Sequence, residues 1–287
     1  MNVCTIVTNK IIEELENGVI PWHKPWCGVR GGAYNLVTHN RYSLSNQMLL
    51  KHNGAYATYR QWMGFGKHVR IKEGENPEIV IFWKWPEERD IDDNNRDNNV
   101  NDKKIRPVLR YYKVFHESQV DGVDVVRLDQ PVLNKNTSPI DFADELIDSY
   151  VNRNGIVFET VITDDAYYDP KKDLIHVPDI KQYKDANEYY STVFHEVIHS
   201  TGHGKRLDRT GLKLSSFGSN VYGKEELVAE VGSAAIMHTI GIDTDNTLRN
   251  SAAYIEGWLK AIRGNEWLII SAASKAEKAV NFVLNNR

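Results

Sequence analysis

Cysteine is almost absent from this 287-residue sequence, which contains only Cys4 and Cys27. Two cysteines cannot form the several cross-links on which small secreted proteins depend, so the sequence excludes a disulfide-stabilised scaffold. A hydrophobic core must stabilise the chain instead, and 41% hydrophobic residues suffice for one large domain or two of ordinary size. Scarce cysteine also indicates a reducing compartment, so we expect a cytoplasmic protein.

The sequence also lacks long apolar runs. None approaches the roughly 20 residues that span a membrane. Residues 1–7 show no basic segment followed by a long apolar one, as a signal peptide would. The net charge of −4 does not by itself favour a nucleic-acid partner. These absences predict a soluble protein with no membrane partner.

One further absence is local, because no aspartate or glutamate occurs between Glu16 and Glu73. The same stretch combines cations with aromatic rings. Cations follow phosphates and rings stack on bases, which are the two components of single-strand recognition. Alternatively, the rings belong to a core and the cations to a solvated surface, but the complete absence of acid favours nucleic-acid binding. The candidate DNA-binding residues are Trp22, Lys24, Trp26, Arg41, Tyr42, Tyr59, Trp62, Lys67, Arg70 and Lys72.

The most informative motif is His195-Glu196-Val197-Ile198-His199. Residues four apart lie on one face of a helix, so His195 and His199 can bind one metal ion. Glu196 projects about 100° further round, where it can reach a water molecule on that ion as general base. This pattern is typical of zinc hydrolases. A surface helix with an ionisable cluster is disfavoured, because the neighbouring residues are apolar.

A catalytic zinc site needs a third protein ligand and keeps a fourth position for water. His203 lies four residues after His199, but three ligands at that spacing would extend over about 12 Å, too far for one ion. A metzincin would have a histidine where Lys205 stands. The third ligand should therefore lie further along the chain.

Glu226 and Glu230 are four residues apart in a helix predicted to run from Glu225 to about Thr239. We expect Glu226 to bind the metal and Glu230 to orient a ligand histidine. Glu225 is the alternative ligand, or an acid that caps the helix. For the oxyanion donor, Tyr222 and His203 are the nearest candidates, and either can instead be structural.

The periodicity of apolar residues predicts an α+β fold with two domains, residues 1–135 and 139–287. Residues 87–104, rich in aspartate and asparagine, are predicted to form a solvated, mobile insertion in a hairpin, and residues 133–139 a linker. The turn at 73–77 joins two predicted strands. Helices are expected at 8–17, 42–51, from 59, at 140–152 and from about 186, and strands at 69–71, 79–85, 109–115, 156–161, 166–168 and 174–177.

The sequence Gly18-Val19-Ile20-Pro21-Trp22-His23-Lys24-Pro25-Trp26, together with residues 194–203 and 225–230, resembles the ArdC family of plasmid antirestriction proteins. The resemblance implies a small α+β domain that binds single-stranded DNA, followed by a zincin-like metallopeptidase domain with Zn²⁺. It also implies a mobile-element protein that protects incoming DNA from restriction. Double-stranded DNA is an alternative partner, and the protein substrate is unknown. The insertion and Gly31-Gly32-Ala33 depart from the family pattern.

Three functions are consistent with these features. The first is a DNA-binding, metallopeptidase-like antirestriction protein, in which Glu196 takes the proton of a zinc-activated water. The second is a DNA protector with a structural metal site, which leaves Glu196 without a role. The third is a cytoplasmic metallopeptidase that acts on protein without DNA, which leaves the acid-free stretch unexplained. We therefore favour the first.

Overall fold

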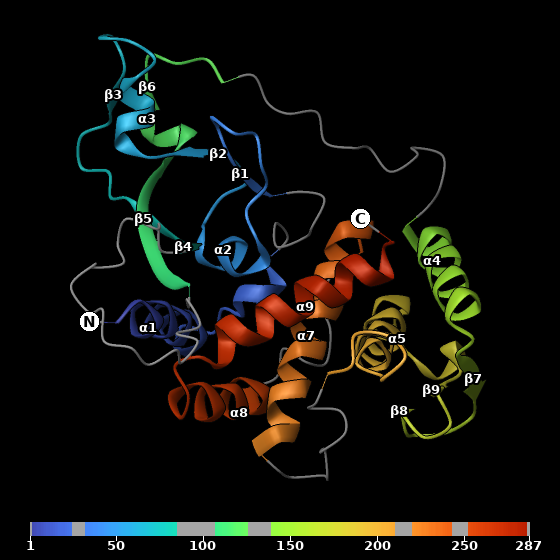
Figure 1. The fold of residues 1–287 in the computed structure, drawn as a ribbon. Coiled ribbons are helices and arrows are strands. Elements are labelled where there is room, and N and C mark those ends of the chain that lie inside the picture. The colour runs from blue at the N-terminus through green and yellow to red at the C-terminus, as the bar shows by residue number, and fades with distance from the viewer. Residues whose placement is uncertain are drawn as a thin grey trace, which may run out of the picture.

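The computed structural model describes residues 2–24, 32–84, 107–125, 139–209, 220–242 and 252–285, and it combines helices with three sheets (Figure 1). The predicted α+β class is confirmed. Trp26, the insertion at 87–104 and the linker at 133–138 lie outside the described residues. Within the described residues, no helix is long and apolar enough to cross a membrane.

The N-terminal part begins with helix α1 (Val3–Glu16), which Asn2 caps by accepting a hydrogen bond from the Cys4 backbone N–H at 3.3 Å. The helix starts five residues before the predicted position, because its buried face extends back to Cys4. Short helical segments follow: η1 (Pro21–His23), α2 (Leu44–Leu49) and α3 (Tyr59–Met63).

The main sheet of this part has the strand order β1-β2-β5-β4. Its strands are β1 (Ala33–Asn35), β2 (Gly54–Ala57), β4 (Glu78–Lys84) and β5 (Val108–His116). The last two form a long antiparallel hairpin. A separate pair joins β3 (Arg70–Ile71) to β6 (Val120–Asp121), which follows the turn η3 (Glu117–Gln119). The turn at 73–77 therefore connects strands of two different sheets.

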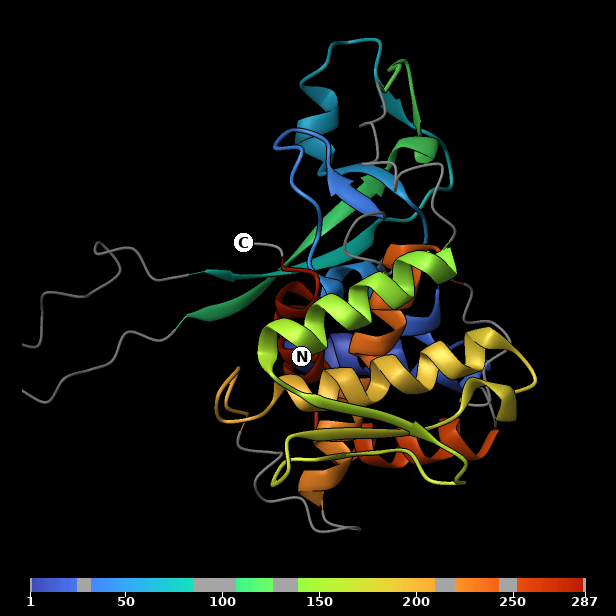
Figure 2. The ribbon, with the colours of Figure 1, turned by 90° about the vertical axis from the view of Figure 1, so that its right-hand side faces the viewer.

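The C-terminal part starts with α4 (Pro139–Asn154) and a three-stranded sheet in the order β7-β9-β8. These strands are β7 (Val157–Val161), β8 (Tyr167–Asp169) and β9 (Leu174–Pro178), and η4 (Ile180–Gln182) follows them. Helix α5 (Ala186–Thr201) packs against β8 and β9, with the sheet along one side of it in Figure 2. Then come α7 (Asn220–Ile240), α8 (Ala252–Arg263) and α9 (Leu268–Val283).

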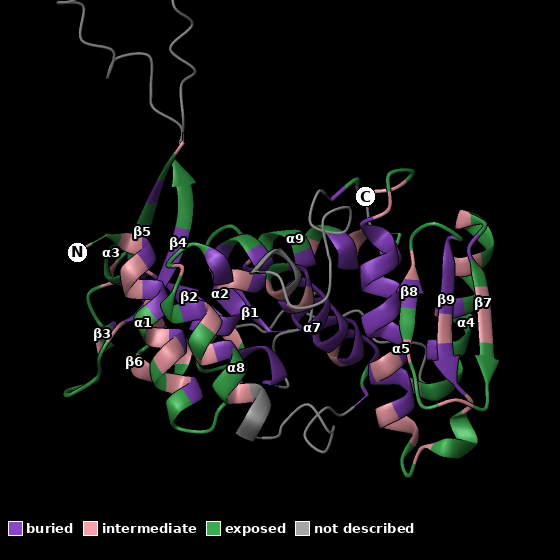
Figure 3. Ribbon diagram, turned by 90° about the horizontal axis from the view of Figure 1, so that it is seen from below, coloured by how far each residue is buried: buried purple, intermediate pink, exposed green. Residues whose placement is uncertain are grey.

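One main hydrophobic core joins elements from both parts of the chain. It contains residues of α1, η1 and α2 together with residues of α4, α5, α7, α8 and α9, and buried positions run through the middle of the molecule in Figure 3. Trp22 of η1 contacts Trp258 of α8 edge to face, with ring centroids 6.3 Å apart. The Leu44 backbone N–H donates to Glu277 of α9 at 3.3 Å. The predicted division at residues 135–139 thus separates two stretches of sequence whose helices share a core.

Candidate metal centre and DNA-binding surface

Helix α5 carries the two histidines within an almost entirely buried stretch. Asp185 caps its N-terminus by accepting from the Asn187 backbone N–H at 3.0 Å, and residues 189–191 and 193–201 are buried. The side chains of His195, Glu196 and His199 are 5–8% exposed. Ionisable groups at such depth need partners, and α7 supplies them.

Helix α7 approaches α5 closely because it has a glycine at the contact. A Cβ atom on Gly232 would lie 2.9 Å from Cδ1 and Cγ1 of Ile198, which is closer than real Cβ atoms come. A larger residue there would push the two helices apart. Gly232 lies two residues after Glu230, so α7 approaches α5 closely beside the acids that face the histidines.

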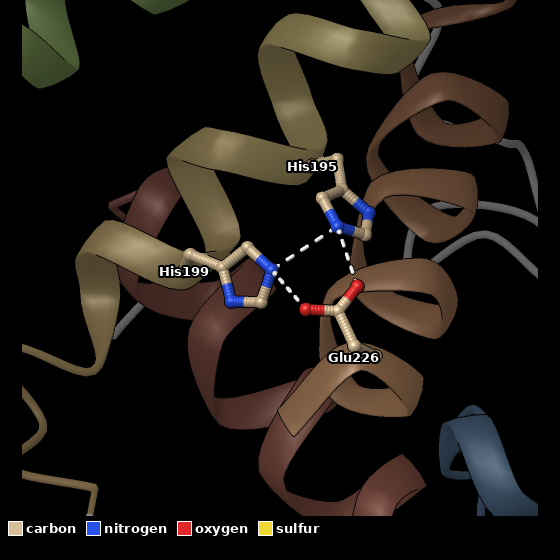
Figure 4. A group of neighbouring side chains, drawn as sticks. All are labelled: His195, His199 and Glu226. Carbon is tan, nitrogen blue, oxygen red and sulfur yellow. Dashed lines mark hydrogen bonds and ion pairs between the residues drawn. The ribbon is translucent and has the colours of Figure 1, made fainter. Parts of the chain in front are cut away.

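His195, His199 and Glu226 form a closed triangle of ligand atoms (Figure 4). The two Nε2 atoms are 3.1 Å apart. Nε2 of His195 lies 3.3 Å from Oε2 of Glu226, and Nε2 of His199 lies 3.3 Å from Oε1, so that one ligand atom from each residue lies within 4.8 Å of the others. A tetrahedral ion with bonds of about 2.0–2.1 Å has ligand-to-ligand edges of about 3.3 Å. The three side chains therefore fit one divalent ion and leave a fourth position for another ligand.

The opposite ring nitrogens of the histidines face two more acids of α7. Nδ1 of His195 lies 3.5 Å from Oε1 of Glu230, and Nδ1 of His199 lies 3.8 Å from Oε1 of Glu225. A carboxylate behind a ligand histidine fixes its tautomer and its ring orientation. Glu230 thus lies behind His195, and its orienting role stays a prediction. Glu225 lies behind His199 in the same way, which the sequence analysis did not anticipate.

Glu225 is bound by a buried arginine. The Arg209 guanidinium donates from Nε to both carboxylate oxygens of Glu225, at 3.0 and 3.2 Å, and from Nη2 to the Ile198 carbonyl at 2.8 Å. It also donates to the Thr201 hydroxyl. The capping interpretation of Glu225 is wrong, because α7 begins five residues earlier, at Asn220. In this arrangement Glu225 faces Nδ1 of His199, whereas Glu226 faces both Nε2 atoms.

The charges of these groups stabilise one another. Burial alone would lower the pKa of His199, but the neighbouring carboxylates of Glu225 and Glu226 raise that pKa to about 10. Burial would raise the pKa of Glu226, yet hydrogen bonds from both histidines hold it well below its usual range. A metal ion must displace the imidazole proton, so metal affinity falls as the pH falls.

Two arginines fix the segment after α5, and neither was among the candidate residues. Arg206 donates to Asp173 at 3.1 Å, to the Tyr168 hydroxyl at 2.9 Å and to the Ser200 carbonyl at 2.8 Å. It thereby ties this segment to the turn between β8 and β9, as Arg209 ties it to α7. Residues in a loop follow no helical or strand periodicity, so their spacing predicts no role for them. Only the charge of these two arginines in an otherwise apolar neighbourhood indicates that they have partners.

The structure provides less information about the two proposed oxyanion donors. His203 is half-buried, accepts from the Lys205 backbone N–H at 3.2 Å and does not belong to the metal-ligating triangle. The side chain of Tyr222 lies outside the described residues.

Several of the candidate DNA-binding residues are in the core. Trp22, Trp62 and Tyr42 are 1%, 0% and 6% exposed, so none offers a ring face on which a base could stack. Lys24 is buried and pairs with Glu14. For the three rings the core interpretation, weighed as the alternative, matches the structure, whereas the buried Lys24 lies in neither of the places expected for the cations. The absence of acidic residues does not distinguish aromatic rings that are buried in the core from rings that are exposed at the surface.

The other candidates are more accessible. Tyr59 is 56% exposed, and Lys67 and Lys72 are exposed. Arg70 is exposed and pairs with Asp121 at 3.4 Å, while Arg41 is half-buried. A set of exposed rings that was not predicted as a site lies on β4 and β5 and includes Phe82 and Tyr112, each 45% exposed.

The fold and the triangle of ligands define a protein class, a zincin-like metalloprotein whose helical His-Glu-x-x-His motif is completed by a glutamate from a second helix. The family described as zincin-like metallopeptidase matches residues 145–275, and the N-terminal domain of anti-restriction factor ArdC matches residues 1–115. The chain belongs to the ArdC family.

Solved structures agree with this assignment. The antirestriction protein ArdC from plasmid R388, in its Mn(II)-bound crystal structure, is 29% identical, with a TM-score of 0.73 over 100% of this chain and 98% of that one. Its metal-free structure gives the same values. A divalent metal is thus bound by a relative of the same fold.

Curated relatives differ in length. DNA primase TraC of Escherichia coli is 33% identical over an alignment of 297 positions, which covers 97% of this chain and 20% of the primase. The chain therefore spans about a fifth of that relative. Protein y4eC of Sinorhizobium fredii (strain NBRC 101917 / NGR234) is 31% identical over 96% of this chain and 90% of its own length.

Proposed function

We propose that this chain is a zinc-dependent peptidase and an antirestriction protein that binds single-stranded DNA. The observation that carries the catalytic part is the triangle of His195, His199 and Glu226, whose ligand atoms, one from each residue, lie within 4.8 Å of one another. Two imidazoles and one carboxylate with a fourth position open are the donor set of catalytic zinc sites, whereas structural sites use four protein ligands. We therefore choose zinc over other divalent ions, although the R388 relative was crystallised with Mn(II).

The chain's own residues divide the work. His195 and His199 would hold the ion through Nε2, Glu226 would supply the third ligand, and Glu230 and Glu225 would orient the two rings. Glu196 is 6% exposed and follows His195 directly on the same helix. It is the base that takes the proton of the attacking water. When bound, the metal polarises that water and the substrate carbonyl.

The short strand β8 is an edge of its sheet and packs against α5. An extended peptide can add to such an edge through backbone hydrogen bonds. This placement supports a polypeptide substrate over a small molecule. Side-chain contacts along that edge would determine which protein substrate is cleaved.

The DNA-binding part rests on family membership and on exposed rings and cations in the N-terminal part. The first 115 residues match the N-terminal domain of ArdC. A protein that covers single strands entering a cell would protect them from cleavage, which is the antirestriction role we propose. A mobile genetic element and a cytoplasmic location fit that role.

The test compares wild type with Glu196→Gln, both loaded with zinc, on a bacterial lysate and on the chain itself, with and without single-stranded DNA. We expect proteolysis by wild type alone and equal zinc content in both. Cleavage that requires DNA would make the two activities one function. DNA binding by both proteins without cleavage by either would favour the alternative of a non-catalytic protector. Cleavage independent of DNA, without DNA binding, would favour a plain metallopeptidase.

The choice of metal has its own test. Metal-free protein is titrated with Zn²⁺ and Mn²⁺ in competition with a chromophoric chelator. We expect zinc to bind more tightly, because this donor set suits it and because its intrinsic affinity is higher. Equal or tighter manganese binding would contradict the assignment.

A further inference from the structure

The hairpin of β4 and β5 presents two aromatic rings and a cation on one face. The strands pair antiparallel, with Phe82 opposite Arg110 and Val80 opposite Tyr112. Cross-strand partners share a face, and so do residues two positions apart, so Phe82, Arg110 and Tyr112 lie on the same side. Both rings are 45% exposed, with centroids 5.9 Å apart. Figure 2 shows the ends of both strands extending beyond the body of the molecule.

The opposite face already anchors the hairpin in the fold. Ile81 and Leu109 are 6% and 8% exposed and belong to the main core. Trp83, on that face, stacks on Trp267 with ring planes 14° apart. The packing of the hairpin therefore does not depend on Phe82 and Tyr112, which remain available at the surface.

The exposed rings rest on a rigid support. Tyr42 is 6% exposed and lies beside Phe82, with ring centroids 6.1 Å apart. Val80, opposite Tyr112, is 1% exposed in a second hydrophobic cluster with Tyr42 and Tyr56. A ring that is held in place loses little conformational entropy when a partner stacks on it.

The charge of the two strands has one sign. Residues 79–84 and 108–115 include no aspartate or glutamate. Lys84 and Arg110 are exposed on the face of the two rings. The one acid of β4, Glu78, is 8% exposed and accepts from the Lys51 backbone N–H at 2.7 Å and from the Tyr56 hydroxyl at 3.1 Å. The face therefore favours an anionic partner with flat, apolar groups.

We propose that the face formed by Phe82, Tyr112, Arg110 and Lys84 is a base-stacking surface for single-stranded DNA. This inference rests on the proposed DNA binding and assigns it to strands β4 and β5. Unpaired bases present free faces to the two rings, while phosphates lie against the cations. Paired bases in a duplex are already stacked on one another. The surface therefore discriminates between single and double strands without reading sequence.

The test measures binding of a fluorescein-labelled oligodeoxythymidine of about 20 nucleotides by anisotropy. The double variant Phe82→Ala/Tyr112→Ala should bind at least about 25-fold more weakly than wild type, because each stacked ring contributes roughly fivefold or more. The variant Phe82→Tyr/Tyr112→Phe keeps both rings and should retain wild-type affinity. Tyr167→Ala removes a ring of similar exposure, 42%, from β8 and should leave the affinity for the oligodeoxythymidine unchanged.

Charge is tested separately from stacking. Arg110→Gln should lower the slope of log affinity against log salt concentration by about 0.7, the value for one phosphate contact on a single strand. Lys171→Gln, at an exposed position in the turn after β8, is the matched control and should leave the slope unchanged. Equal slopes for Arg110→Gln and wild type would show that Arg110 contacts no phosphate, and would exclude it from the proposed surface.

A third measurement locates the DNA directly. Oligodeoxythymidine carrying 5-iododeoxyuridine is photocrosslinked to wild type, and the adducts should map to Phe82 or Tyr112. No binding by wild type would sink the DNA-binding function itself. Binding by wild type with unchanged affinity in the ring-free variant, or adducts only elsewhere, would overturn this surface and leave that function standing. An equal loss of duplex and single-strand affinity would overturn the stacking role.

Discussion

The metal centre and the β4–β5 hairpin place their functional groups in opposite environments. His195 and Glu230 are 5% and 3% exposed between two helices, whereas Phe82 and Tyr112 are each 45% exposed on strands that extend from the body. A metal site needs ligands held in fixed geometry with few competing waters, whereas a stacking surface must stay open to its partner. We therefore expect changes at the metal centre to affect both folding and ligand binding, and changes on the hairpin to affect binding alone.

The largest effect is expected from Arg209→Ala. The change leaves Glu225 buried without its arginine, and breaking a buried pair on one side costs about 3–5 kcal/mol in the free energy of unfolding. Urea denaturation of the metal-free protein measures it. Arg70→Ala is the matched control, because Arg70 pairs with Asp121 while its side chain is 78% exposed, and it should cost less than about 1 kcal/mol. Similar losses in the free energy of unfolding at both positions would show that burial does not make the Arg209–Glu225 pair more important than the exposed Arg70–Asp121 pair.

A tryptophan in the core should behave unlike an exposed ring. Trp62 is 0% exposed and donates from Nε1 to the Phe115 carbonyl at 3.0 Å. Trp62→Ala should lower the free energy of unfolding by about 3–5 kcal/mol, through the cavity and the lost hydrogen bond. Phe82→Ala should lower it by less than about 1 kcal/mol. Thermal denaturation distinguishes the two, and a large destabilisation by Phe82→Ala would place that ring in the core.

Glu230→Gln sharpens the comparison within the metal centre. The amide keeps the shape but loses the charge that faces Nδ1 of His195. Zinc affinity should fall about 10–100-fold, as it does when the partner of a ligand histidine is replaced. Competition with a chelator measures it, with Glu256→Gln, an exposed acid on α8, as control. Unchanged affinity would make Glu230 a buried acid without influence on the site.

The smallest effect is expected at the turn between β8 and β9. Burial would raise the pKa of Asp173, but its hydrogen bonds from Arg206 and Tyr168 lower it below the usual range. The ion pair therefore stabilises the fold above about pH 4, and this contribution is lost as the pH falls through the pKa in the folded state. Asp173→Asn should cost about 1–2 kcal/mol at pH 7, and this cost should shrink as the pH falls below about 4. A cost independent of pH would exclude the charge as its source.

The metal centre could be anticipated because its chemistry imposes a helical spacing. His195 and His199 had to be four residues apart on one helix, and Glu226 and Glu230 repeated that spacing on another. The structure brings three of these side chains into one triangle and places Glu230 behind His195. Arg209 and Arg206 were missed because they lie in a loop, where no periodicity links residues far apart in sequence.

The DNA-binding surface could not be anticipated in the same way. Trp22 and Phe82 are both apolar rings near cations, and composition alone gives them the same weight. Whether a ring is buried depends on the elements that pack over it, and α8 covers Trp22 through Trp258. The strand pattern of residues 79–85 did predict β4. The pairing of β3 with β6 instead of a neighbour depended on contacts between residues about 50 positions apart.

The core shared by the two parts of the chain makes metal binding a property of the whole molecule. Helices α1 and α2 contribute no metal ligand, yet they pack on α8 and α9, and α9 in turn packs on α7. An ion that binds only the folded state divides the equilibrium constant of global unfolding by one plus the ratio of its concentration to its Kd. Amide protons of α1 that exchange only through global opening should therefore exchange about a hundredfold more slowly at a metal concentration of about 100 Kd.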